Sequence, residues 1–122
     1  MSKTILMVDD SASVRQMVGM TLKQAGYSVV EAADGREALQ KAAANPIDAV
    51  ITDLNMPVMD GLSFIREYRT TPASSGVPIV FLTTESDDSL KAEAKAAGAT
   101  GWMVKPFKPD QLLAIVRKVA GA

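Results

Sequence analysis

Short apolar runs alternate with segments of helical periodicity along the chain, and this alternation constrains the fold more than any other feature. The apolar runs cover Thr4–Val8, Ser28–Ala32, Ala49–Thr52, Pro78–Thr83 and Gly101–Val104. Continuous apolar runs of this length are typical of parallel strands that are covered on both faces. The run at Ser28–Ala32 contains more polar residues, which favours a place at the edge of the sheet.

Helices are expected between these runs. They cover Val14–Leu22, Asp34–Asn45, Leu62–Tyr68, Leu90–Ala97 and Pro109–Val119. Glycines at 26 and 98 follow two of them as stop signals, and Asp34 with Glu37 resembles a capping box. The alternation predicts an α/β fold, (βα)5, in which a parallel five-stranded sheet carries helices on both faces. The loop at residues 70–76 is expected to be the most flexible segment.

The composition limits the chemistry that the chain can perform. We expect residues 1–122 to form one domain, because this length supports a single hydrophobic core. The chain has no cysteine and no histidine, which excludes disulfides and a Ser-His-Asp triad and limits any metal to a hard ion such as Mg²⁺ or Ca²⁺. A net charge of −1 without a basic run argues against nucleic-acid binding. The first apolar run is too short for a signal peptide or a membrane span, so a soluble, cytoplasmic protein is expected.

Polar side chains lie at the ends of four of the five predicted strands. They are Asp9 and Asp10 after the first strand, Asp53 and Asn55 at the third, Thr83, Thr84 and Glu85 at the fourth, and Lys105 after the fifth. The carboxyl ends of parallel strands form the crevice in which α/β proteins bind ligands. These acids, hydroxyls and lysine are therefore expected at one edge of the sheet.

Each of these residues also has an ordinary structural interpretation. Asp10 alone is typical of a helix N-cap, Thr83 of a strand end and Lys105 of a solvated charge. Their coincidence at one edge favours a functional site. Three carboxylates there require a counter-charge, which Mg²⁺ supplies, and a carboxylate is a competent nucleophile toward phosphorus. A lysine and a hydroxyl can bind the remaining phosphoryl oxygens.

Four short motifs carry a resemblance to a known family. They are VDDS at Val8–Ser11, DLNMPVMDG at Asp53–Gly61, Thr83 before Glu85, and KPF at Lys105–Phe107. In order and spacing they resemble the receiver domain of two-component response regulators, the CheY-like family, over essentially the whole chain. The resemblance implies a flavodoxin-like, doubly wound sheet with strand order 2-1-3-4-5, which is the order in CheY itself. It also implies a phosphoacceptor that is not a turnover enzyme.

The resemblance assigns the phosphoryl chemistry to particular residues. Asp53 would accept the phosphoryl group, and Lys105 and the hydroxyl of Thr83 would contact it. The Mg²⁺ ligands would be Asp9, Asp10, Asp53 and Asn55, with Asp9 acting through a metal-bound water and Asn55 through its backbone carbonyl. The bond from Lys105 to Pro106 would be cis, a minority state that needs tertiary support.

Further residues would transmit and tune the signal. Thr83 would move toward the phosphoryl group, and Trp102 would be the aromatic switch residue on the fifth strand. The family more often has Tyr or Phe at that position, and Ala or Gly where this chain has Thr84. Two outcomes stay open: Trp102 turns inward on activation, or it stays on the surface as a partner contact. Asn55 and Glu85 would tune the attack of water on the acyl phosphate.

We expect a stand-alone response regulator that functions as a monomer. No output domain is expected, because the chain ends at Ala122, just past its last helix. Its donor would be the phosphohistidine of a CheA-like histidine kinase. This donor would be a separate molecule, because the chain has no histidine. Its target would be a protein such as the flagellar motor switch or a phosphatase, bound through the fourth helix, fifth strand and fifth helix. Candidate contacts there are Trp102, Lys91, Lys95 and Lys108.

Three other functions fit parts of this pattern. A phosphorelay intermediate or phosphate sink would use the same receiver chemistry without a motor target. A phosphatase of the haloacid dehalogenase type would use Asp53 as nucleophile, but it needs an acid/base Asp two residues on, where this chain has Asn55. A flavodoxin-like cofactor carrier would need a phosphate-binding loop after the first strand, where Asp9 and Asp10 repel phosphate.

Overall fold

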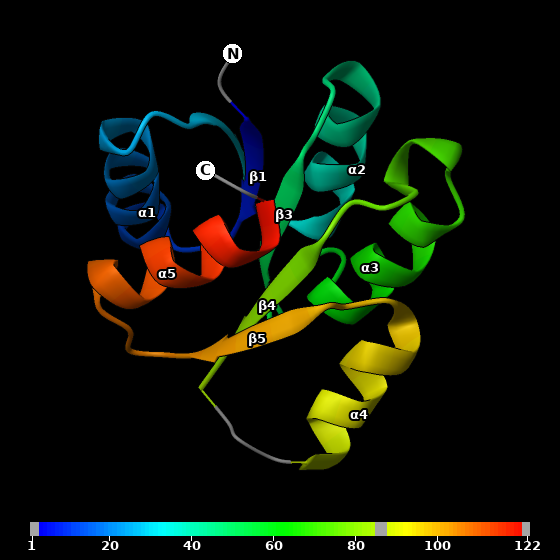
Figure 1. The fold of residues 1–122 in the computed structure, drawn as a ribbon. Helices are drawn as coiled ribbons and strands as arrows, with labels where there is room; N and C mark the ends of the chain where they lie inside the picture. Colours follow the sequence, from blue (N-terminus) through cyan, green and yellow to red (C-terminus); the bar gives the residue numbers. More distant parts are fainter. Residues whose placement is uncertain (1–2, 85–87, 121–122) are drawn as a thin grey trace.

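A five-stranded parallel sheet forms the centre of the computed structural model, which describes residues 3–84 and 88–120 (Figure 1). The strands are β1 (Thr4–Val8), β2 (Ser28–Ala32), β3 (Ala49–Asp53), β4 (Ile79–Thr83) and β5 (Gly101–Val104). Their order in the sheet is β2-β1-β3-β4-β5, and every neighbouring pair is parallel. The predicted α/β fold with the flavodoxin-like strand order is confirmed.

Helices cover both faces of this sheet. They are α1 (Ala12–Gln24), α2 (Gly35–Ala44), α3 (Gly61–Arg69), α4 (Asp88–Ala97) and α5 (Pro109–Ala120), with a short 3₁₀ helix, η1 (Pro72–Ser74), after α3. α1 and α5 lie on one face, and α2, α3 and α4 lie on the other (Figure 1). Among the described residues, no helix combines the length and the apolar character needed to cross a bilayer.

Alternate side chains of the strands supply two hydrophobic cores, one on each face. The core on the side of α2, α3 and α4 contains Leu6, Val8, Val50, Ile79 and Phe81, and the core on the side of α1 and α5 contains Ile5, Met7, Ile51, Leu82 and Met103. Successive side chains of a strand point to opposite faces, so an apolar run feeds both cores. The predicted edge strand is β2, which exposes Ser28 and Glu31.

Side-chain caps fix where α1 and α2 begin. Ser11 Oγ accepts a hydrogen bond from the N–H of Val14 at 3.3 Å, so the N-cap of α1 is Ser11. The structural interpretation of Asp10 as a helix cap is therefore wrong. At α2, Asp34 Oδ1 accepts from the N–H of Glu37 at 2.8 Å, and Glu37 Oε1 accepts from the N–H of Ala33 at 2.6 Å. This confirms a variant of the capping box.

Two strand boundaries differ slightly from the sequence prediction. β3 extends one residue further and includes Asp53. β4 begins at Ile79, because Pro78 has no N–H to donate to a strand ladder. The first difference matters for the site, since it places Asp53 on the sheet and not in the following loop.

The segment at residues 70–76 is held by hydrogen bonds, contrary to the expectation of a flexible loop. It contains η1, and Ser74 in it is buried. Arg69 Nη1 donates to the carbonyl of Ser74 at 2.6 Å. Arg69 Nε and Nη2 donate to the carbonyl of Gly98 at 3.1 and 2.8 Å. One guanidinium group therefore joins the end of α3, η1 and the residue after α4.

Gly61, the first residue of α3, packs directly against the end of β3. Its N–H donates to the carbonyl of Leu54 at 2.9 Å. A Cβ atom added to Gly61 would lie 2.1 Å from the carbonyl oxygen of Asp53 and 2.9 Å from Leu54 Cα. Only glycine fits this contact, so the backbone that carries Asp53 is held against the start of α3.

Candidate functional site

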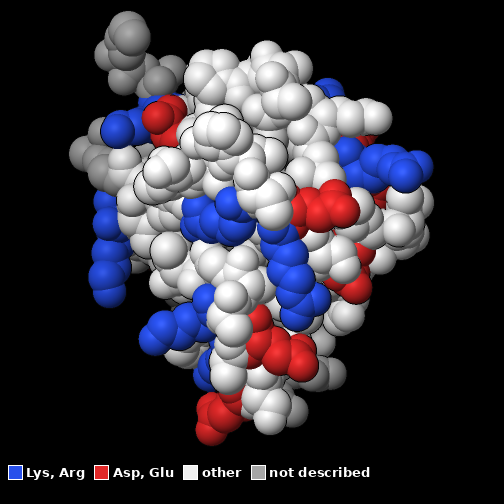
Figure 2. Space-filling model, turned by 90° about the vertical axis from the view of Figure 1, so that its right-hand side faces the viewer, with Lys and Arg blue, Asp and Glu red and all other residues white. Residues whose placement is uncertain are grey.

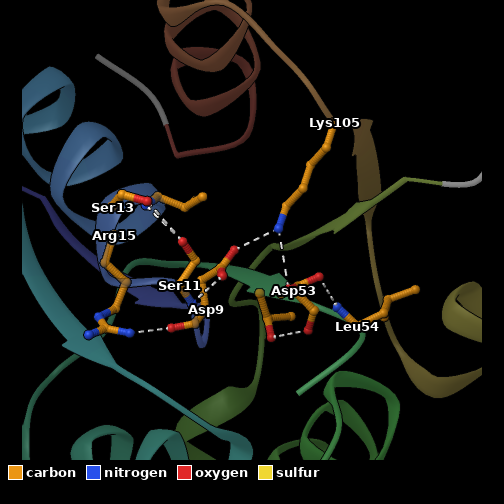
Figure 3. A network of polar contacts seen from close by, with 9 residues as sticks. Asp9, Ser11, Ser13, Arg15, Asp53, Leu54 and Lys105 are labelled. Carbon is orange, nitrogen blue, oxygen red and sulfur yellow. Dashed lines mark hydrogen bonds and ion pairs between the residues drawn. The ribbon is translucent and has the colours of Figure 1, made fainter. Parts of the chain in front are cut away.

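Asp9, Asp53 and Lys105 meet at the carboxyl edge of the sheet, where β1, β3 and β5 end (Figure 3). Lys105 Nζ lies 2.9 Å from Asp9 Oδ2 and 3.3 Å from Asp53 Oδ2. Asp10 is the exposed neighbour, and one carboxylate oxygen from each of the three aspartates lies within 4.8 Å of the others. The predicted cluster of acids with a lysine is therefore present in the fold.

Asp9 is fully buried, and hydrogen bonds hold it on every side. Its Oδ1 accepts from the N–H of Ser11 at 2.9 Å, and its Oδ2 accepts from Lys105 Nζ at 2.9 Å. Its own N–H donates to the carbonyl of Ala32 at 3.1 Å, and its carbonyl accepts from Arg15 Nη1 at 2.6 Å. A carboxylate is buried at tolerable cost only with such compensation. The position of Asp9 is therefore tightly defined.

Asp53 is the last residue of β3, and its side chain is nearly buried. Its Oδ1 accepts from the N–H of Leu54 at 2.8 Å, and the Thr52 hydroxyl donates to its backbone carbonyl at 2.9 Å. Burial raises the pKa of Asp53, the negative charge of Asp9 raises it further, and Lys105 only partly opposes these effects. The free site therefore disfavours the ionised form of Asp53 and would gain from an added cation.

Lys105 stays positively charged in this setting. Burial alone would lower the pKa of Lys105, but the hydrogen bond to Asp9 and the charges of Asp9 and Asp53 outweigh burial, so that the pKa is raised. The peptide bond from Lys105 to Pro106 is cis, as the resemblance implied. Lys105 thus supplies a fixed positive charge beside the carboxylate of Asp53.

The donor set of the acidic cluster fits Mg²⁺. All three side chains offer carboxylate oxygens, which hard divalent cations prefer, and the chain has no cysteine or histidine to favour a softer metal. When all three carboxylates are ionised, they carry three negative charges and Lys105 carries one positive charge, which leaves two negative charges in the cluster. One Mg²⁺ ion would neutralise this remainder. The carboxylates of Asp10 and Asp53 would hold it directly, and Asp9 would act through a metal-bound water, as the resemblance implies.

The other predicted site residues lie at or near the same edge. Thr83 ends β4, is buried, and accepts a hydrogen bond at its carbonyl from the N–H of Lys105 at 2.7 Å. Asn55 is exposed and follows Asp53 by two residues. Glu85 lies outside the described residues. The roles given to these residues stay predictions.

Three contributors to the site were not anticipated from the sequence. They are the Arg15 guanidinium, the N–H of Ser11 and the N–H of Leu54, all of which bind Asp9 or Asp53. The two backbone groups carry no signal in a sequence. Arg15 carried a weak one, because it stands one helical turn after Ser11 at the start of a helix that follows the acidic pair.

Trp102 lies on the surface, next to a groove between α4 and β5. The residue is 46% exposed, and Lys91 Nζ lies 4.2 Å from the centroid of its ring, a cation–π contact. The ring of Phe81 lies beneath it, with centroids 6.4 Å apart. The groove has a volume of about 580 Å³, and Lys95 also lines it. Three of the predicted output residues, Trp102, Lys91 and Lys95, therefore share one surface.

Charges of both signs are interspersed on the side of the molecule that α2, α3 and α4 cover. Figure 2 shows Lys and Arg side chains next to Asp and Glu side chains on this side. Nucleic-acid binding typically uses a continuous basic surface instead. The described residues on this side therefore present charges of both signs and not a uniformly basic surface.

A parallel (βα)5 sheet whose carboxyl edge carries three aspartates and a lysine defines a receiver-type phosphoacceptor, which is not a turnover enzyme. Residues 5–117 match the family described as response regulator receiver domain, and the chain belongs to this family.

Several known proteins are similar to this chain over nearly its whole length. The chemotaxis protein CheY1 of Helicobacter pylori is 39% identical over 119 residues, which are 96% of each protein. The structure of the chemotaxis protein CheY4 of Vibrio cholerae is 50% identical with a TM-score of 0.95, covering 98% of this chain and 99% of that one. The receiver domain of the sensor histidine kinase PA1611 from Pseudomonas aeruginosa PAO1 is 31% identical with a TM-score of 0.90 over all of both chains, and its structure has a magnesium ion coordinated in the active site cleft. This chain spans about half the length of other curated relatives that it matches.

The raised pKa of Asp53 leads to a prediction about stability without Mg²⁺. A group whose pKa is raised on folding contributes stability below its unfolded pKa and loses that contribution as the pH rises through its folded pKa. Asp53→Asn should therefore be more stable than the unchanged protein at neutral pH. This advantage should shrink as the pH falls toward the ordinary value of 3.8. Urea unfolding of both proteins across this range measures the difference, and an advantage that grew at low pH would contradict the assignment.

Proposed function

We propose that this chain is a response regulator that accepts a phosphoryl group on Asp53 from the phosphohistidine of a CheA-like histidine kinase, with Mg²⁺, in the cytoplasm. The observation that carries the proposal is the position of Lys105 Nζ, 2.9 Å from Asp9 and 3.3 Å from Asp53, beside the cluster that Asp10 completes. Receiver domains have histidine kinases as partners. The donor must be a separate molecule, because this chain contains no histidine.

The proposed transfer forms one bond and breaks one. A carboxylate oxygen of Asp53 attacks phosphorus, and the new oxygen–phosphorus bond forms as the phosphorus–nitrogen bond of the phosphohistidine breaks. The leaving nitrogen keeps the electron pair of that bond, and the proton on the other ring nitrogen leaves the imidazole neutral. No general base is needed, because a carboxylate attacks phosphorus without giving up a proton. This suits a chain without histidine.

The residues around Asp53 would stabilise the transferred group. Bound Mg²⁺ supplies positive charge to the phosphoryl oxygens during such a transfer. Lys105 would donate to a second phosphoryl oxygen from the position in which it now pairs with Asp53. Thr83, at the adjacent strand end, would bind a third oxygen and so transmit the change. Asn55 and Glu85 would set how fast water hydrolyses the acyl phosphate.

The proposed output is a change in affinity for a protein target at the surface of α4, β5 and α5. Exposed Trp102 with Lys91 and Lys95 supports this location, and Lys108 lies exposed just before α5. The similarity to CheY1 and CheY4 over nearly the whole chain supports a role in chemotaxis, with the flagellar motor switch or a phosphatase as the target. Phosphorylation would shift a population between two states, with the chain acting as a monomer.

Incubation with a small acyl-phosphate donor and increasing Mg²⁺ tests the receiver chemistry. We expect the intact mass to increase by one phosphoryl group, with an extent that depends on Mg²⁺ and vanishes with a chelator. Fluorescence of Trp102, the single tryptophan, would report whether the change reaches the output surface. An unmodified mass at every Mg²⁺ concentration would contradict the proposal and indicate a docking module with a receiver fold.

A phosphorelay intermediate or phosphate sink is the second candidate. The similarity to the receiver domain of a sensor histidine kinase over the full chain favours it, because that receiver domain belongs to a kinase. The phosphorylated protein would then return its phosphoryl group to a histidine phosphotransfer protein. Transfer in that direction would favour the relay, and its absence together with target binding would favour the chemotaxis role.

A further inference from the structure

Arg15 is a charged residue that contacts the site and that has no role in the proposed reaction. It stands in the first turn of α1, and its side chain is 20% exposed. Nη1 donates to the backbone carbonyl of Asp9 at 2.6 Å, while Nε lies 3.4 Å from Glu31 Oε1 on the edge strand β2. Figure 3 shows the guanidinium reaching the backbone of Asp9 from the side opposite Lys105.

The carbonyl that Arg15 binds belongs to the peptide unit that joins Asp9 to Asp10. The pairing of β1 with both of its neighbours ends at Val8, so this carbonyl lies beyond the strand ladder. The carboxylate and the N–H of Asp9 have their own partners. Arg15 is therefore the side chain that fixes the orientation of the Asp9–Asp10 peptide unit.

Asp10 depends on this orientation more than Asp9 does. Asp10 is exposed, and its carboxylate has no hydrogen bond or ion pair to any residue within 3–84 and 88–120. No partner side chain therefore holds it within 4.8 Å of the other two carboxylates, and its place depends on the direction in which the backbone presents it. A rotation of the Asp9–Asp10 peptide unit would turn Asp10 away from Asp53.

We propose that Arg15 is a positioning residue for the Mg²⁺ site. By holding the Asp9 carbonyl, it turns the Asp10 carboxylate toward Asp53, where Mg²⁺ would bind. The inference rests on the proposed function, because it assigns the site to Mg²⁺. Glu31 orients the guanidinium and balances its charge. A lysine at this position has a single ammonium group, which cannot contact the Asp9 carbonyl and the Glu31 carboxylate as the planar guanidinium group does.

Charge and positioning predict opposite effects of removing Arg15. A positive charge near a cation site opposes cation binding, so charge alone would make Arg15→Ala bind Mg²⁺ more tightly. Positioning makes the variant bind more weakly, and the loss of such a supporting contact typically costs about ten- to a hundredfold in metal affinity. The direction of the change therefore separates the two effects.

Calorimetric titration of the full chain with Mg²⁺ tests the proposal. We expect Kd to rise about ten- to a hundredfold in Arg15→Ala and by a smaller factor in Arg15→Lys, which keeps the charge and is the variant to use if the alanine variant does not fold. Arg66→Ala, an exposed arginine on α3, is the matched control and should leave Kd unchanged. Thermal unfolding without Mg²⁺ identifies which variants are folded.

The phosphorylation rate gives a second readout. Below saturation with Mg²⁺, folded Arg15 variants should be phosphorylated more slowly than the unchanged protein, and raising the Mg²⁺ concentration should narrow the difference, because the variants bind Mg²⁺ more weakly. An unchanged or lower Kd in a folded Arg15 variant overturns the proposal while the proposed function stands. Failure of the unchanged protein to bind Mg²⁺ and to gain a phosphoryl group overturns both.

Discussion

Asp53→Asn should gain no phosphoryl group when it is incubated with Mg²⁺ and a small acyl-phosphate donor. An amide nitrogen is a poor nucleophile, and the variant also loses a negative charge and an anionic ligand from the acidic cluster. The carboxamide has nearly the same shape as the carboxylate, and its oxygen can still accept the hydrogen bond from Leu54. We therefore expect a folded protein in which the reaction is lost completely. Intact mass after a fixed incubation measures this loss.

Asp110→Asn is the matched control for this variant. Asp110 is exposed in the first turn of α5 and lies outside the acidic cluster, so its variant should be phosphorylated like the unchanged protein. A stable phosphoryl group on Asp53→Asn would show that another residue is the acceptor and would remove the basis of the proposed function. Circular dichroism of both variants distinguishes a lost reaction from a lost fold.

Gly61→Ala should destabilise the protein by about 3 kcal/mol. The added Cβ would lie 2.1 Å from the carbonyl oxygen of Asp53 and 2.9 Å from Leu54 Cα, and both of these atoms belong to the backbone. Backbone cannot turn aside as a flexible side chain can, so α3 must separate from the end of β3. Overpacking in a closely packed interior costs about 1–3 kcal/mol, and a contact this short places Gly61→Ala at the upper end of that range. The midpoint and slope of urea unfolding give the change in free energy.

Gly19→Ala provides the contrast within the same chain. Gly19 is buried in α1, and the nearest atom to an added Cβ, Glu31 Oε2, lies at 3.6 Å, an ordinary van der Waals distance. Alanine is a better helix residue than glycine, and we expect a gain of about 0.5–1 kcal/mol. Equal stability of the two alanine variants would show that the contact between Gly61 and the end of β3 is looser than the structure describes.

The strands could be expected from the sequence because burial on both faces leaves a direct trace, whereas their order was expected from the family resemblance alone. A strand such as β4, which is entirely buried, reads as an unbroken apolar run, and the polar residue that ends it marks the edge of the sheet. The same reasoning brought Asp9, Asp53 and Lys105 together before their distances were known. These residues stand far apart in the sequence, up to 96 positions for Asp9 and Lys105. Topology, and not local pattern, makes them neighbours.

Contacts to the backbone could not be expected in the same way. Nearly every residue type has an N–H and a carbonyl, so the bonds from the N–H of Leu54 to Asp53 and from the N–H of Ser11 to Asp9 have no signature in residue identity. The segment at residues 70–76 shows the same limit. Its small polar residues are typical of a loop, yet its order comes from Arg69, which belongs to the preceding helix. The interpretation of Asp10 as a cap failed because Ser11, one residue later, competes for that position.

The three hydrogen bonds of Arg69 also have a mechanical consequence. They fasten the carboxyl end of α4, through Gly98, to α3 and η1, at the end of the sheet remote from the acidic cluster. Only Ala94 of the described α4 side chains is fully buried, so the remainder of the helix has few deep contacts. α4 is thus anchored at its carboxyl end, and a tilt of this helix about that end would displace Asp88 much further than Ala97.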